Sequence, residues 1–233
     1  MKTKLAAFDF DSTVFDTTKD CLGLLHLFPN GETPEAMAKA IAAKDWDTTR
    51  AILASEINKM NNITKQDLIE AMLTSGEFVP FMDEALKGFA KDHDIIIISG
   101  GWKMQIEVYL EKHGLMKYIN KIYATPVDIS EDAKITIKPI PEKWRKVCEN
   151  TGRQFCKEHI LKGHLDKQNQ SYEQVVYIGD SMNDLCASQS LGNKDIVCPR
   201  KGFKLDKVLE TKNVEAQIIS WKDGKDLMEK LNL

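Results

Sequence analysis

The sequence is poor in the features that define several classes of protein. Only five of its 233 residues are cysteines, and none lies in a C-x-x-C pair. Reduced thiols in a cytoplasmic protein are therefore expected. Basic residues are not in excess, because 32 Lys and Arg are set against 35 Asp and Glu, a net charge of −3. We therefore expect no nucleic-acid partner. No uncharged apolar run approaches the ~20 residues of a membrane-spanning helix, so no membrane partner is expected either.

Short apolar segments alternate with stretches of helical periodicity along most of the chain. Strands that are apolar on both faces and alternate with helices indicate a parallel sheet covered by helices on both sides, a Rossmann-like α/β fold. The segments predicted as strands are Leu5–Phe10, Ile95–Ile98, Ile122–Ala124, Val175–Ile178, Ile196–Cys198 and Ala216–Ile219.

One region breaks this alternation. From about Thr33 to Gly76 the pattern predicts helices only, the first starting at Thr33-Pro34, the second spanning Thr48–Met60 and the third capped by Thr64. We therefore expect a core of residues 1–16 and 80–233 and a small all-helical cap of residues 17–79. The polar segment Ser130–Pro141 is expected to be a loop or a peripheral hairpin.

Two carboxylates follow the first predicted strand. Asp9 and Asp11 are two residues apart, so in an extended chain they point to the same side. Carboxylates held together repel each other unless a cation or a shared proton offsets the charge. The pair indicates a hard metal, an acid/base pair or both, with solvated turn residues as the alternative.

A second acidic run follows Val175–Ile178. It contains Asp180 and Asp184 within Gly179–Asp184, again directly after a buried strand. If both strands are central and parallel, these carboxylates face the first pair across one crevice. Oxygen ligands without a neighbouring His or Cys favour Mg²⁺ over zinc.

Two further elements could bind an anion. Ser99, Gly100 and Gly101 follow a predicted strand and open a predicted helix, so they offer a hydroxyl, backbone N–H groups and a helix N-terminus, with a simple strand-to-helix turn as the alternative. A lysine before a helix is the other element, and either Lys157 or Lys162 could supply it.

In this order, D-F-D-S-T, S-G-G, Lys157 and G-D-S-M-N-D resemble the four motifs of the haloacid-dehalogenase (HAD) superfamily of phosphotransferases. The helical insert is similar to the C1-type cap of that superfamily. Within it, the chain most resembles the family of phosphoethanolamine/phosphocholine phosphatases and pyridoxal phosphate phosphatases. The segments behind this closer resemblance are Asp20, Phe155–Lys157, Val176–Asp180 and Pro199–Phe203, with Trp221, Gly224 and Asp226.

The resemblance implies catalytic roles for the first acidic pair. Asp9 would be the nucleophile that forms an aspartyl-phosphate. Asp11 would protonate the departing alkoxide and then activate water.

The resemblance also implies the ligands of phosphate and metal. Phosphate would be held by Ser99, Gly100, Lys157 and Asn183. Mg²⁺ would be held by Asp9, Asp11 through its backbone carbonyl, and Asp180, with Asp184 in support.

This chain departs from the family at two places. Gly100 stands where the family usually has an aspartate that helps to bind a cationic head group, although Asp20, the other acid linked to that role, is present. The cysteine-rich stretch before the motif lysine is reduced to Cys148 and Cys156, so no zinc site is expected there. His159 and His164 are interpreted as surface or packing residues.

The expected function is Mg²⁺-dependent hydrolysis of a small phosphate ester, of the phosphoethanolamine/phosphocholine or pyridoxal 5′-phosphate class. Phosphoserine and thiamine monophosphate are alternative substrates. A dehalogenase would not need Asp11 or the second acidic run, and a phosphonate hydrolase would need an amine from the cap. A non-catalytic signalling module phosphorylated on Asp9 is the alternative from another class.

Overall fold

The centre of the molecule is a six-stranded parallel sheet with strand order β10-β9-β8-β1-β4-β5. The computed structural model describes residues 2–17, 24, 27–28, 33–43, 45–167 and 172–233. The sheet comprises β1 (Lys4–Phe8), β4 (His93–Trp102), β5 (Lys121–Thr125), β8 (Gln174–Gly179), β9 (Ile196–Pro199) and β10 (Gln217–Ile218). The predicted α/β fold is confirmed, and β1, which carries the first acidic pair, lies between β4 and β8.

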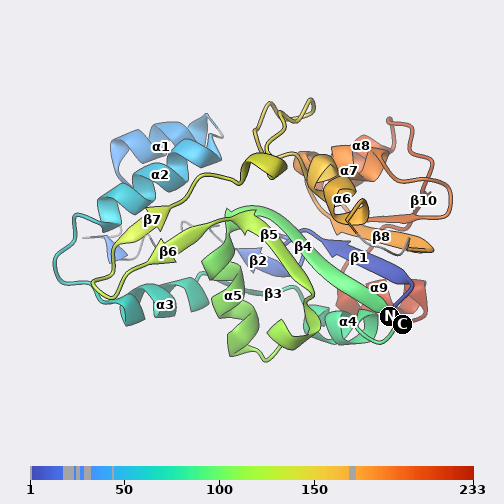
Figure 1. Cartoon of the computed structure of the whole chain (residues 1–233), viewed down its shortest axis with the longest axis horizontal. Coiled ribbons are helices and arrows are strands. Elements are labelled where there is room, and N and C mark those ends of the chain that lie inside the picture. Colours follow the sequence, from blue (N-terminus) through green and yellow to red (C-terminus); the bar gives the residue numbers. More distant parts are fainter. Residues whose placement is uncertain (1, 18–23, 25–26, 29–32, 44, 168–171) are drawn as a thin grey trace.

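Helices cover both faces of the sheet because its strands are apolar on both sides (Figure 1). Along β1, Leu5 and Ala7 pack into one hydrophobic cluster while Ala6 and Phe8 pack into the other. The first face is covered by α6 (Lys157–Leu165), α7 (Leu185–Gln189) and α8 (Lys204–Leu209). The second is covered by α4 (Met82–Phe89), α5 (Lys103–Lys112) and α9 (Gly224–Leu231). Short 3₁₀ helices lie at η3 (Met116–Tyr118), η4 (Glu142–Trp144) and η5 (Met182–Asp184).

The described part of the segment predicted to be the cap contains three helices, α1 (Glu35–Ala42), α2 (Trp46–Ile57) and α3 (Lys65–Leu73). The capping box at Thr64 is confirmed. The other two predicted starts were displaced. Pro34 is the N-cap of α1 and supplies no side-chain hydrogen bond, and α2 begins after Asp45, whose carboxylate accepts from the Thr48 amide. The cap has its own hydrophobic cluster, which includes Met37, Leu53 and Leu68.

Two short strands connect the cap to the core, and the sequence pattern did not indicate either of them. β2 (Phe15–Thr17) and β3 (Gly76–Phe78) pair antiparallel. They approach so closely that a Cβ on Gly76 would lie 2.3 Å from the carbonyl oxygen of Asp16. The two junctions of the cap are thus tied side by side.

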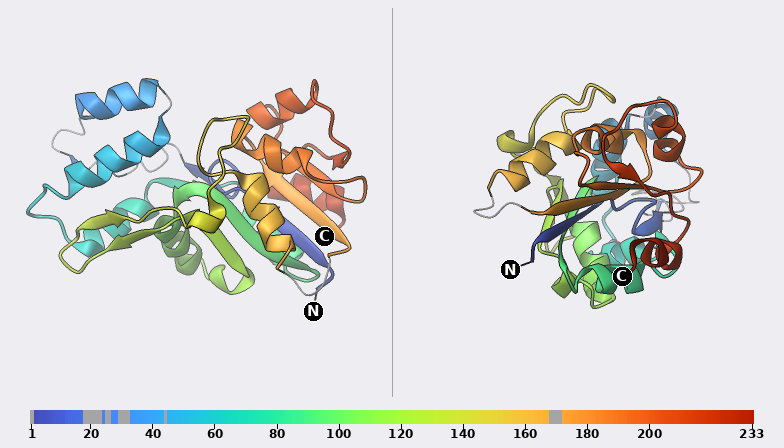
Figure 2. Two further views of the ribbon diagram at one scale, coloured as in Figure 1. Left: turned by 45° about the horizontal axis from the view of Figure 1, so that its top comes forward. Right: turned by 90° about the vertical axis from the view of Figure 1, so that its right-hand side faces the viewer.

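A hairpin from a later part of the chain completes the cap. β6 (Val127–Ile129) and β7 (Ile135–Ile137) pair antiparallel, and their apolar side chains join the hydrophobic cluster of the cap helices. Figure 2 shows this hairpin on the same side of the molecule as α1 and α2. The segment predicted as a loop or hairpin therefore contains β7. We propose that the cap unit consists of residues 17–79 together with this hairpin.

The Ser99-Gly100-Gly101 segment lies inside β4 rather than at the start of a helix. The pairing of β4 with β5 shifts register between Ile98 and Trp102, and α5 begins only at Lys103. Within the described residues, no helix is both long and apolar enough to cross a membrane.

Candidate active site

Asp9 lies at the carboxyl end of β1 and is only 4% exposed. Its backbone N–H donates to the carbonyl of Ile178 on the neighbouring strand, at 2.8 Å. Its Oδ1 accepts a hydrogen bond from the backbone N–H of Phe10 at 2.7 Å. The backbone then turns tightly, because the amides of Thr13, Val14 and Phe15 all donate to the carbonyl of Phe10. This turn holds Asp9 and the residues after it at the carboxyl end of the sheet.

Asp184 is held in place by the loop that follows β8. Its Oδ2 accepts from the backbone amides of Ser181 (2.9 Å) and Asp180 (3.2 Å), and its Oδ1 accepts from the Tyr177 hydroxyl at 2.7 Å. The carboxylate also fills the space beside Gly179, where a Cβ would lie 2.6 Å from Asp184 Cγ. The hydrogen bonds of Asp184 thus fix the conformation of this loop.

Lys157 joins the two acidic motifs. It is the first residue of α6 and is fully buried, and its Nζ lies 2.7 Å from Asp9 Oδ1 and 2.7 Å from Asp184 Oδ1. Lys162, the other candidate, is exposed and pairs with Glu158 at 2.6 Å. The geometry therefore favours Lys157 as the lysine of the site.

Asp9, Asp180 and Asp184 each place a carboxylate oxygen within 4.8 Å of the others. Burial, and then the charge of Asp184, raise the pKa of Asp9 well above its ordinary value, against the opposing effect of Lys157. Burial and Asp184 also raise the pKa of Asp180, to about 7. Burial acts to lower the pKa of Lys157, but the two neighbouring carboxylates outweigh it and raise that pKa. The cluster thus holds more negative charge than Lys157 balances, and a hard divalent cation fits it.

Ser99 and Asp11 contact each other. The buried Ser99 hydroxyl accepts from the backbone N–H of Gly101 at 2.9 Å and lies 3.4 Å from Asp11 Oδ2, to which it donates. A Cβ on Gly101 would lie 3.1 Å from both of these oxygens, so a glycine there leaves them room. Asp11 is partly exposed and its side chain is not part of the group formed by Asp9, Asp180 and Asp184.

The remaining predicted site residues lie nearby or outside the described chain. Asn183 is in η5, where its side-chain oxygen accepts from the Ser181 hydroxyl at 2.7 Å. The carbonyl of Gly100 accepts from Thr125, and a Cβ on Gly100 would lie 3.9 Å from a guanidinium nitrogen of Arg153. Asp20, the predicted head-group ligand, lies outside the described residues.

Two supporting residues were given no role from the sequence. Tyr177 lies on β8, in the Val176–Asp180 segment of the family resemblance, and only its hydrogen bond to Asp184 shows its use. Arg200 follows β9, and its guanidinium donates to the carbonyl of Ser12 at 2.9 Å and to both carboxylate oxygens of Asp16. Its place in the Pro199–Phe203 segment was the only available signal. Arg200 ties the junction of the cap to the end of the sheet.

Comparison with known proteins agrees with this arrangement. The family model described as "Putative Phosphatase" matches residues 4–233. The human pyridoxal phosphate phosphatase PHOSPHO2 is 26% identical over 238 residues, which cover 97% of this chain and 96% of the relative. The phosphoethanolamine/phosphocholine phosphatase of Gallus gallus is 23% identical, with 96% of this chain and 85% of the relative covered.

A solved structure shares the fold along nearly the whole chain. It is a HAD family hydrolase from Salmonella enterica serovar Typhi, with a TM-score of 0.63 at 18% identity, covering 97% of this chain and 70% of that chain. The chain therefore has the fold of a HAD family hydrolase, and the family model that matches nearly its whole length shows that it belongs to the Putative Phosphatase family.

Proposed function

We propose that the protein is a cytoplasmic, Mg²⁺-dependent phosphomonoesterase that hydrolyses a small phosphorylated metabolite through an aspartyl-phosphate on Asp9. The observation that carries the proposal is the buried ion pair of Lys157 with Asp9 and Asp184, set beside the Asp180 carboxylate. A buried cluster of this kind is suited to a dianionic phosphate that arrives with a metal ion.

The residues of the acidic cluster fit Mg²⁺. They provide oxygen ligands only. Burial and repulsion between carboxylates raise the pKa values of Asp9 and Asp180, and a bound cation would offset that repulsion. Asp9 and Asp180 would hold the ion together with the backbone carbonyl of Asp11, while Asp184 orients the loop. When bound, Mg²⁺ would supply positive charge that stabilises the phosphoryl group in the transition state.

In the first step, Asp9 attacks the phosphorus and the bond between phosphorus and the ester oxygen breaks. Asp11 donates its proton to the departing alkoxide. Lys157, which the neighbouring carboxylates keep protonated, and the Ser99 hydroxyl bind the phosphoryl oxygens. Other residues hold both groups in position, because Asp9 and Asp184 contact Lys157 while Asp11 and Gly101 contact the Ser99 hydroxyl. The Ser99 hydroxyl would turn from Asp11 to donate to a phosphoryl oxygen.

In the second step, Asp11 removes a proton from a water molecule, which attacks the same phosphorus. The bond between phosphorus and Asp9 breaks and inorganic phosphate leaves. The partial exposure of Asp11 suits this role, because the water must reach it from the crevice under the cap.

The substrate belongs to the class named for the relatives, small esters such as pyridoxal 5′-phosphate or phosphoethanolamine. Gly100 removes one acid that would attract a cationic head group, and the guanidinium of Arg153 lies next to this position. Both features favour a leaving group without a quaternary ammonium, so pyridoxal 5′-phosphate is preferred over phosphocholine.

The test is turnover of p-nitrophenyl phosphate and of a panel of phosphorylated metabolites, with Mg²⁺, by wild type and by Asp9→Asn. We expect Asp9→Asn to lower kcat by a factor on the order of 10³ or more, because the nucleophile is lost. Circular dichroism should show an unchanged fold. Lys162→Ala, which alters an exposed lysine of α6, is the matched control and should keep wild-type turnover. Normal activity of Asp9→Asn would refute the nucleophile.

A further inference from the structure

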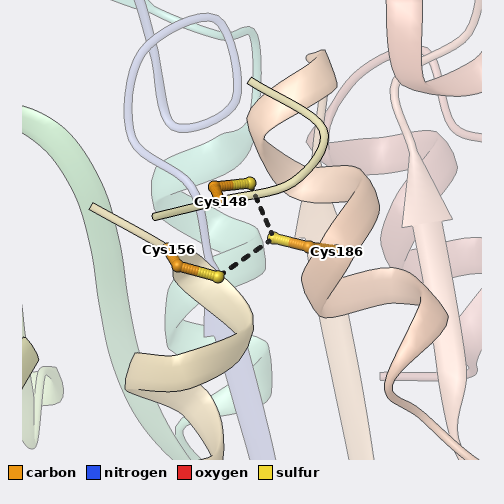
Figure 3. Close-up of side chains that lie close together, drawn as sticks. All are labelled: Cys148, Cys156 and Cys186. Carbon is orange, nitrogen blue, oxygen red and sulfur yellow. Dashed lines mark hydrogen bonds between the residues drawn. The ribbon is translucent and has the colours of Figure 1, made fainter. Parts of the chain in front are cut away.

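Three buried thiols from separate parts of the chain lie close together (Figure 3). Cys148 lies in the loop after η4, Cys156 is the N-cap of α6, and Cys186 lies in α7. The Sγ of Cys186 lies 3.7 Å from that of Cys148 and 3.8 Å from that of Cys156. Cys186 follows the second acidic motif closely, and nothing in the sequence pattern groups it with the other two.

The spacing of the sulfur atoms suits a tetrahedral metal site. Thiolates bound to zinc at about 2.3 Å in tetrahedral geometry have sulfur atoms about 3.8 Å apart. The observed separations of 3.7 and 3.8 Å agree with this value. A disulfide would instead require about 2.05 Å between two of the sulfurs.

Backbone hydrogen bonds hold the segments that carry these thiols. The amides of Thr151 and Gly152 donate to the carbonyl of Cys148, at 3.2 and 2.7 Å, and the amide of Cys148 donates to the carbonyl of Arg153 at 2.7 Å. The Sγ of Cys186 donates to the carbonyl of Asn183, at 3.6 Å. The loop that follows Cys148 thus folds back on this residue, which holds the thiol in place for a metal ion.

A fourth ligand has room to bind. Cys156 and Cys186 line a pocket of ≈ 180 Å³, whose wall also contains the carboxylate residues Glu149 and Glu158. A water molecule or one of these carboxylates could complete a tetrahedral shell there. Within the described part of the chain, the three thiols are separate from the acidic group of Asp9, Asp180 and Asp184.

The sequence predicts no zinc site at Cys148 and Cys156, but the fold adds a third thiol to this pair. We propose that Cys148, Cys156 and Cys186 bind a zinc ion that has a structural role. The three thiols release their protons to solvent as the ion binds. Cys156 directly precedes Lys157, and Cys186 lies two residues after Asp184. The ion therefore joins the two segments that carry the buried Lys157–Asp184 ion pair and holds the loop around Cys148 against α7.

The test measures zinc directly and does not depend on catalysis. Protein purified with a non-chelating reductant, loaded with Zn²⁺ and dialysed, should hold close to one zinc per chain by elemental analysis. Replacement by Co²⁺ should produce sulfur-to-cobalt charge-transfer absorption, which carboxylates do not produce. Cys148→Ala and Cys186→Ala should lose this zinc and this absorption.

Two control variants separate this site from its surroundings. Cys198→Ala removes a buried thiol outside the cluster and should keep the zinc. Asp180→Asn alters the acidic cluster and should also keep both the zinc and the cobalt absorption. Zinc lost in Asp180→Asn but kept in Cys148→Ala would overturn the proposal.

The wild-type protein alone can also overturn it. Substoichiometric zinc after loading, or a Cys148–Cys186 or Cys156–Cys186 disulfide found by mass spectrometry in untreated protein, would contradict a metal site. Removal of zinc by a chelator should lower the Tm, and zinc added back should restore it, because the ion binds only the folded form. The same Tm with and without zinc would refute the structural role.

Discussion

Lys157 is a buried cation whose two carboxylate partners come from different motifs, Asp9 and Asp184. We expect Lys157→Ala to lower kcat/KM for p-nitrophenyl phosphate on the order of 10² or more, because a preorganised charge at the phosphate is lost. Lys162→Ala, one turn and a residue further along the same helix, should leave kcat/KM unchanged. Steady-state kinetics on both variants checks this, with circular dichroism to confirm folding. Equal losses in the two variants would contradict the assignment of Lys157.

We expect Mg²⁺ binding to depend on pH through Asp180. Its pKa is raised to about 7, mainly by burial and then by Asp184, so the folded protein keeps a proton there that an unfolded chain has already released. In metal-free protein the free energy of unfolding should therefore fall as the pH rises from about 4 to about 7. Mg²⁺ must displace the proton below that pH, so its stabilising effect should grow toward pH 8.

Thermal unfolding with and without MgCl₂, at about pH 6 and about pH 8, measures this dependence. The increase in Tm caused by Mg²⁺ should be larger at the higher pH. The same increase at both values would show that the ion does not compete with this proton. Excess EDTA should in addition stop turnover, and undiminished rates would refute the metal requirement.

The convergence of Asp9, Asp180 and Asp184 could be predicted because carboxylates after apolar strands are a specific pattern. Asp9 follows β1, Asp180 and Asp184 follow β8, and these parallel neighbouring strands bring the three carboxylates to the same end of the sheet. Tyr177 and Cys186 could not be assigned, because each looks like an ordinary core residue until the fold shows its partner. The individual catalytic roles remain predictions.

At the scale of elements, the β2–β3 pair depends on a glycine. A Cβ on Gly76 would lie 2.3 Å from the backbone oxygen of Asp16 and 2.8 Å from the ring of Phe15. Gly76→Ala should lower the free energy of unfolding by about 1–3 kcal/mol, because the backbone of β2 or the ring of Phe15 must move away from the added methyl group. Urea unfolding measures this change.

Gly163→Ala is the matched control for Gly76→Ala. Gly163 lies within α6, and a Cβ added to it would meet no neighbour within 4 Å, so alanine should stabilise the helix by about 0.5–1 kcal/mol. A Gly76→Ala protein as stable as wild type would show that the two junctions are not closely packed.

Long apolar strands and helices were predictable, whereas the short elements were not. β2 and β3 have three residues each, too few for a periodic pattern. Ser99, Gly100 and Gly101 indicate a turn by composition, yet the sheet extends through them with a register shift that depends on β5. Pairing partners, rather than local preference, decide such segments.

At the scale of the molecule, the division into core and cap follows hydrophobic contacts more than chain order. The cluster of the cap includes Trp102, the last residue of β4, and Ile135 of the β6–β7 hairpin. A continuous insert of helices is what the sequence indicated, because the hairpin lies well beyond it along the chain and its few apolar residues do not show where they pack.

Asn58 is the C-cap of α2, and its side chain makes two hydrogen bonds to the backbone of Ile135 in β7. The backbone carbonyl of Asn58 accepts a third hydrogen bond from the ammonium of Lys134. These bonds connect the helices of the cap to the β6–β7 hairpin, which follows β5 of the sheet. The helices and the hairpin are consequently joined to the sheet at two separate places, the β2–β3 pair and the chain that follows β5. We therefore expect any movement of this unit relative to the sheet to be a rotation about the line that joins the two attachments.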